Sequence, residues 1–165
     1  MKYILRKDLK LEVDGRTLYR IQAIKSFDNI NKGDIGGYIE AEQNLSQDNV
    51  AWIHGNAWVY GNAWVYGNAR VCDNARVYGN ARVSDNAQVY GNARVYCNAM
   101  VKSAPFCITG PIPHTITVTE THIFIGCEGH TIAYWRKNIV SIGEKRGYTR
   151  NQINKTIELL KAVLK

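Results

Sequence analysis

The sequence has little proline and cysteine and lacks a long apolar run. No segment reaches the roughly 20 consecutive apolar residues that a membrane-spanning helix needs, and the charged first residues, which include Asp8, leave no room for the apolar core of a secretory signal. The four cysteines lack the spacing of a disulfide framework (Cys72, Cys97, Cys107 and Cys127). We therefore expect reduced thiols in a soluble, cytoplasmic protein that has no membrane partner.

The 165 residues suffice for one domain with a buried core, since 45% are hydrophobic and 21% are charged. The net charge of +7 is unevenly distributed. Residues 1–48 carry eight basic and eight acidic side chains, whereas residues 131–165 carry eight basic and only two acidic ones. This segment is either a solvated surface or one that attracts an anionic partner, and its candidate contacts are His130, Arg136 and Lys137.

A strict six-residue repeat dominates the middle of the chain. The unit usually reads Ala-x-Val-x-(Gly/Asp)-Asn, and nine units span residues 51–102. A helix has 3.6 residues per turn, so a period of six would scatter the alanines and valines around it, and the recurrent Gly-Asn pairs would weaken it. Ala-x-Val instead suits a short strand with one buried face, and Gly-Asn suits a corner with positive φ.

Because one unit cannot bury its own apolar face, successive units must stack, and we predict a mainly β fold built on a parallel β-helix. The pattern, in which Val59 is followed four positions later by Ala63, resembles the hexapeptide-repeat family of left-handed β-helices. The resemblance implies a left-handed winding, three units in each triangular coil, and assembly as a homotrimer packed along its sides.

A second resemblance is carried by the segment Asp34-Ile-Gly-Gly-Tyr-Ile-Glu, followed by Asn44-Leu-Ser-Gln and Trp52-Ile. These residues look like the opening of the YdcK-like group of hexapeptide-repeat proteins, which occurs in enterobacteria, phages and prophages. The later segment Ile125-Gly-Cys-Glu-Gly-His-Thr-Ile, followed by Trp135, resembles the C-terminal module of the phage members. The resemblance implies that the chain is encoded by a phage or prophage.

The sequence divides into three parts. Residues 1–48 are predicted to form a β-hairpin around Asp14-Gly15 and an irregular first coil, which together cap the solenoid. Residues 49–103 are predicted to form the β-helix. Residues 104–165 are predicted to form a second hairpin and one amphipathic helix that begins after Thr149.

With three units in a coil, residues 18 apart lie above one another on adjacent strands. The outward position between Ala and Val then stacks Trp on Arg on every face, and the outward position after Val stacks three tyrosines on one face. The expected sets are Trp52 with Arg70, Trp58 with Arg76 and Arg94, Trp64 with Arg82, and the ladder of Tyr60, Tyr78 and Tyr96. Exposed Trp, Tyr and Arg are typical of interfaces and nucleotide-stacking surfaces, but aromatic ladders also stabilise neighbouring strands. A structural role, a subunit interface and a ligand surface all stay open.

The resemblance also raises the question of catalysis. Hexapeptide-repeat acyltransferases use a histidine as general base, normally beside a loop inserted into the coils. This repeat has no insertion, its one histidine is His54 at the edge, and His130 is the other candidate base. No catalytic triad pattern or phosphate-binding loop is present. We assign no catalytic residue and no cofactor, and we favour a protein that is not an enzyme.

Cys127 and His130 have the spacing of a pair of zinc ligands. Two ligands do not make a zinc site, and Cys127 and His122 would point to opposite faces of a regular strand. We therefore expect a tight turn at this place and no bound metal.

These observations predict a non-catalytic binding or assembly protein on a β-helix scaffold. Its Trp, Tyr and Arg surfaces would bind an anionic, stackable partner such as a nucleotide, a nucleic acid or a host defence protein. If a phage encodes the chain, sequestration of that partner would serve counter-defence. A hexapeptide-repeat acyltransferase and a purely structural oligomeric component are the alternatives.

Overall fold

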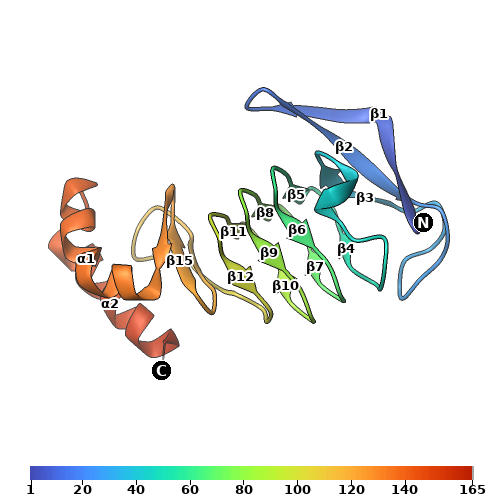
Figure 1. Ribbon diagram of the computed structural model, residues 1–165. Coiled ribbons are helices and arrows are strands. Elements are labelled where there is room, and N and C mark those ends of the chain that lie inside the picture. Colours follow the sequence, from blue (N-terminus) through green and yellow to red (C-terminus); the bar gives the residue numbers. More distant parts are fainter. Residues whose placement is uncertain (165) are drawn as a thin grey trace.

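The computed structural model describes residues 1–164. It is mainly β and elongated, with a parallel β-solenoid between an N-terminal hairpin and a C-terminal module of sheet and helices (Figure 1). Lys165, the last residue of the predicted third part, lies outside the described residues. Among the described residues, no helix combines the length and the apolar character that a bilayer crossing requires.

The solenoid is built from two-residue strands that begin every six residues. Each strand holds an outward-facing residue followed by a fully buried Val or Ile, and the preceding Ala is also fully buried. The strands are β4 (Trp52–Ile53), β5 (Trp58–Val59), β6 (Trp64–Val65), β7 (Arg70–Val71), β8 (Arg76–Val77), β9 (Arg82–Val83), β10 (Gln88–Val89), β11 (Arg94–Val95) and β12 (Met100–Val101).

Parallel pairing joins residues that are 18 apart, as in Trp58 with Arg76 and Arg76 with Arg94. This register confirms the predicted stacking and gives three sheets along the solenoid, which contain β4-β7-β10, β5-β8-β11 and β6-β9-β12. The corners between strands have positive φ, for example 67° at Gly61 and 57° at Cys97. Glycine adopts this conformation without strain, and its recurrence in the repeat is explained by the corner.

The N-terminal part extends one of these sheets. Strands β1 (Tyr3–Val13) and β2 (Arg16–Ala23) form the predicted hairpin, with positive φ at Asp14 and Gly15. β3 (Ile35–Ile39) pairs with β2 and also, in parallel, with β5, and the short helix η1 (Glu42–Asn44) follows it. The resulting sheet has the order β1-β2-β3-β5-β8-β11.

One residue at this end is less accessible than predicted. Trp52 occupies the expected outward position of the repeat, but it is only 2% exposed. The N-terminal segment covers the first coil, and the Trp52 ring packs edge-on against Tyr3 at 6.3 Å and Phe27 at 5.5 Å between ring centroids. The predicted pairing of Trp52 with Arg70 in adjacent strands is confirmed. The covered Trp52 ring, however, is not accessible to a ligand.

The C-terminal part contains more regular structure than the sequence analysis predicted. Its antiparallel sheet consists of β13 (Phe106–Ile108), β14 (Ile116–Val118), β15 (His122–Ile125) and β16 (Glu128–Thr131). Two helices, α1 (Ile132–Lys145) and α2 (Arg150–Val163), pack against it. The hairpin of β14 and β15 and the helix after Thr149 were predicted, whereas β13, β16 and α1 were missed.

Candidate functional site

A groove lies where the C-terminal module meets the last coils of the solenoid. Its volume is about 370 Å³, which falls within the range of about 300–1,000 Å³ that is typical of ligand pockets. One wall is the solenoid, through the strand residues Arg76 and Arg94 and the corner residues Asn74 and Asn92. The facing wall comes from the C-terminal part (Pro113, His114, Thr115, Thr117, Phe124 and Gly126). None of these described lining residues is acidic, so the groove is electropositive.

The repeat and the docked module fix the two arginines in place. Val77 and Val95, the neighbours of Arg76 and Arg94, are fully buried, so the arginine side chains point outward on adjacent strands. The backbone N–H of Arg94 donates to the Thr117 hydroxyl at 3.3 Å. The module therefore contacts the solenoid directly beside the groove.

Arg76 and Arg94 differ from several other arginines in having no partner carboxylate among the described residues. Arg70 pairs with Asp28, and Arg16 pairs with Glu40. Asp73 precedes the lining residue Asn74, but its carboxylate accepts the backbone N–H of Gly91 at 2.8 Å. The two guanidinium groups in the groove are thus left with free hydrogen-bond donors for an anion.

The row of outward side chains continues beyond the residues that the repeat predicts. Arg20 pairs with Tyr38, and Tyr38 pairs with Trp58. The guanidinium carbon of Arg20 lies 4.3 Å from the Tyr38 ring centroid, and that of Arg76 lies 4.0 Å from the Trp58 ring. Tyr38 is 20 residues before Trp58, so a period of 18 could not find it.

The tyrosine ladder exists as predicted, but it is covered at both ends. Tyr60 and Tyr78 stack with centroids 5.0 Å apart, and Tyr78 and Tyr96 stack at 4.8 Å. Arg16 lies over the outer ring, and Phe124 packs against Tyr96, which is only 9% exposed. Since Tyr78 is stacked on both sides and the two outer rings are covered by Arg16 and Phe124, this ladder joins the module to the solenoid and offers no free stacking surface.

The remaining expected surface residues lie on other faces. Trp64 is 40% exposed and stacks on Tyr66, with centroids 4.1 Å apart. Its predicted neighbour Arg82 is paired with it in parallel strands and is also exposed. Arg136 and Lys137 are exposed on α1, away from the residues that line the Arg76 and Arg94 groove. The structure thus places all three predicted Trp and Arg sets on adjacent strands, but only the set of Trp58, Arg76 and Arg94 contributes residues to the groove lining.

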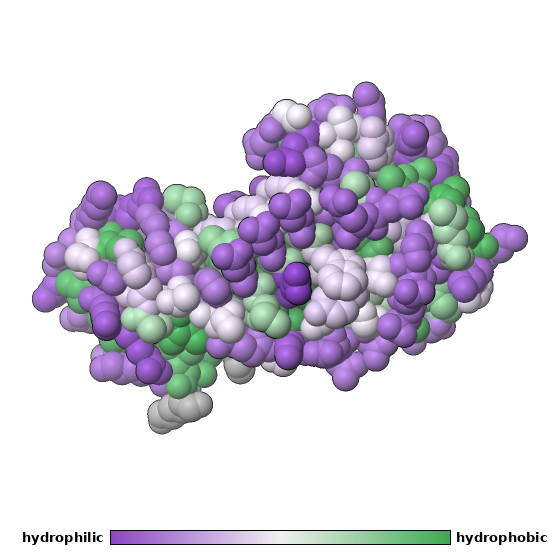
Figure 2. Space-filling view, viewed as in Figure 1, coloured by the Kyte–Doolittle hydropathy of each residue, from purple (hydrophilic) through white to green (hydrophobic). Residues whose placement is uncertain are grey.

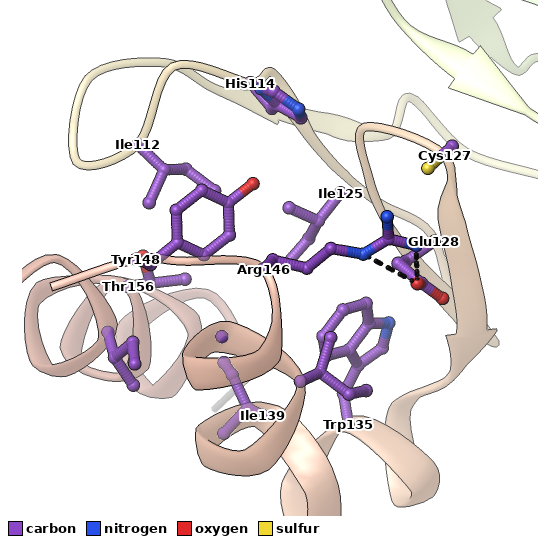
Figure 3. A pocket seen from close by; sticks show the side chains of 13 residues that line it. Ile112, His114, Ile125, Cys127, Glu128, Trp135, Ile139, Arg146, Tyr148 and Thr156 are labelled. Carbon is purple, nitrogen blue, oxygen red and sulfur yellow. Dashed lines mark hydrogen bonds and ion pairs between the residues drawn. The ribbon is translucent and has the colours of Figure 1, made fainter. Parts of the chain in front are cut away.

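A second cavity lies inside the C-terminal module and is shown in Figure 3. Its floor is apolar and includes Trp135 and Ile139, while Arg146 extends across it to pair with Glu128. The space inside is about 50 Å³, far below the typical ligand pocket. We therefore interpret it as a gap in the packing between the sheet and the helices.

The candidate catalytic and metal-binding side chains are dispersed. His54 is half-buried at the first coil, and burial, with the charge of Arg70, lowers its pKa. His130 lies in the C-terminal module, where its Nε2 contacts Glu128 at 3.0 Å. Cys127 is exposed next to Gly126, whose φ of 60° forms the turn between β15 and β16. The described residues contain no group of three His, Cys, Asp or Glu side chains that could hold a metal ion.

Comparison with known proteins identifies the solenoid only. The family described as YdcK beta solenoid repeat matches residues 75–87 and 87–102. The match supports a YdcK-like β-solenoid and falls on the coils that carry Arg76 and Arg94. No curated protein matches the chain.

Proposed function

We propose that this chain is a non-catalytic binding protein that takes an anionic ligand in the groove of Arg76 and Arg94. The observation that carries the proposal is the pair of arginines without carboxylate partners in a groove whose described lining has no acidic residue. Guanidinium groups bind phosphate and carboxylate groups through paired N–H donors. A ligand with several phosphate groups, such as a nucleotide, matches this chemistry best.

The amides of Asn74 and Asn92 add neutral donors and acceptors beside the two charges. They would hydrogen-bond the polar parts of a nucleotide that the arginines do not reach. Trp58 contributes to the site indirectly, because its ring holds the guanidinium of Arg76 by a cation–π contact. The Arg76 guanidinium is therefore held in place before a ligand arrives, which lowers the entropic cost of binding at this group.

The finer features expected from the family resemblance belong to the same proposal. We propose that the solenoid winds left-handed, that the chain is encoded by a phage or prophage, and that it works in the cytoplasm as a homotrimer. In that setting, sequestration of a nucleotide would counter a host defence. The exposed side chains of Trp64 and Met100, on one face of the solenoid, would supply the subunit contact.

A calorimetric titration tests the proposed function. The panel contains ATP, a cyclic dinucleotide, an oligothymidylate and inorganic tripolyphosphate, with acetyl-CoA as the substrate of an acyltransferase. The proposal predicts saturable binding of at least one phosphate ligand that is lost in Arg76→Gln/Arg94→Gln. Turnover of acetyl-CoA that disappears in His54→Ala or His130→Ala would instead establish the acyltransferase alternative.

A further inference from the structure

A second groove, of about 380 Å³, lies between the two C-terminal helices and the sheet beneath them. Its floor includes Ile123 and Trp135, both buried, and the Trp135 indole N–H donates to the Ile123 carbonyl at 2.7 Å. Its walls are apolar side chains, with Val140 on α1 and Ile157 and Leu164 at α2. Figure 2 shows apolar surface gathered beside the C-terminal end of α2.

The rim of this groove is basic. Arg136 lies on α1 and Lys161 on α2, and both are exposed. Neither has a salt-bridge partner among the described residues. Of the two acidic residues after residue 130, Glu144 pairs with Arg150, and Glu158 lines a different surface hollow beside Lys155.

We propose that this groove docks an acidic amphipathic helix of a partner protein. The apolar side of that helix would fill the groove, and its flanking carboxylates would meet Arg136 and Lys161. A groove between two helices, each 14 residues long, suits the recognition mode in which a third helix is laid into it. The basic rim would set the position of the partner and accelerate its association.

Two other occupants fit the groove less well. A second copy of the module would bring its own basic rim against this one, and like charges in an interface are unfavourable. A bilayer is bound by apolar side chains that project outward from an amphipathic helix, whereas these side chains line a hollow whose floor is buried. The charge and the shape together favour an acidic helix.

The test uses the full chain and a fluorescein-labelled synthetic helix with leucines at i, i+3, i+4 and i+7 and glutamates elsewhere. Fluorescence anisotropy is expected to show saturable binding that weakens about tenfold or more in Arg136→Glu/Lys161→Glu. The matched control is Lys137→Glu/Lys145→Glu, which makes the same change of charge at exposed positions outside the groove lining. The control is expected to bind nearly as well as the native chain.

Several results would overturn the proposal. One is an absence of binding, and another is equal binding of a peptide with the same residues in scrambled order. If the control pair weakened peptide binding equally, the loss of affinity would follow from the change in net charge and not from the groove. If vesicles of anionic phospholipid bound the native chain and the peptide did not, the groove would be a membrane-binding site.

Because Arg76→Gln/Arg94→Gln leaves this groove intact, unchanged peptide binding in that variant separates this proposal from the proposed function.

Discussion

The Lys2 ammonium donates a hydrogen bond of 2.7 Å to the carbonyl of Ala51, the first residue of the repeat. The same Nζ donates to the carbonyls of Asp48 and Asn49, both at 3.2 Å. Lys2 is 1% exposed and Ala51 is fully buried, so the Ala51 carbonyl has no ready access to water. A residue at the start of the chain thus closes the end of the solenoid that begins 49 residues later.

Lys2→Met is therefore expected to destabilise the protein. The substitution keeps much of the apolar stem but leaves the buried carbonyl of Ala51 without this donor, which costs about 1–3 kcal/mol. Chemical denaturation measures the free energy of unfolding, with exposed Lys7→Met as the matched control. Equal unfolding midpoints for the two variants would show that the Lys2 hydrogen bonds do not hold this end together.

The stacked tyrosines predict a loss of stability at alkaline pH. Burial, with a smaller contribution from Tyr60, raises the pKa of Tyr78 to about 12 from 10.0. Above pH 10 the unfolded chain releases the Tyr78 proton while the folded chain retains it, so the free energy of unfolding falls as pH rises from 10 to 12. The stabilising contribution is fully present below pH 10.

The Tyr78→Phe variant isolates this effect. Its free energy of unfolding is expected to fall less than that of the native chain between pH 9 and pH 11, because phenylalanine has no proton to release. Tyr90→Phe, at an exposed position on another face, serves as the control and should follow the native chain. Parallel curves for all three proteins would contradict the assigned cause.

The proposed subunit contact predicts a change of oligomeric state. Trp64 and Met100 are 40% and 42% exposed on the β6-β9-β12 sheet. Trp64→Glu/Met100→Glu should convert the proposed homotrimer to a monomer, because it removes the two large apolar side chains and adds the cost of desolvating charged ones at the contact. Light scattering gives the mass, and Tyr90→Glu on the β10 face is the control. A native chain that is already monomeric, or a trimer that persists in the double variant, would refute this contact.

The solenoid was predictable from sequence because its repeat encodes both the strand and the corner. Ala75 and Val77 are buried for the same reason as Ala93 and Val95, and an interval of 18 residues places Arg76 below Arg94. The sequence therefore predicted which Trp and Arg residues pair. It did not predict which pairs stay accessible, since Trp52 is covered by Tyr3 and Phe27, residues outside the repeat.

The C-terminal part was predicted less completely because its local patterns are short. Ile132, Trp135, Ile139 and Ile142 follow the spacing of an amphipathic helix and could have revealed α1, with Thr131 as its N-cap. The groove beside Arg94 could not be found in this way. It is formed by contacts between residues far apart in sequence, such as Arg94 with Thr117.

Arg76 and Arg94 are proposed to bind a polyanion, and the most direct measurement is the affinity for fluorescein-labelled oligothymidylate over a range of salt concentrations. The native chain is compared with two double variants, Arg76→Gln/Arg94→Gln and Lys7→Gln/Lys137→Gln, and the second pair removes the same charge at exposed positions outside the groove lining. Loss of two phosphate contacts should weaken binding about tenfold or more and reduce the slope of log K against log salt by about 1.4. Equal affinities and slopes for the two double variants, or no binding by the native chain, would contradict the account.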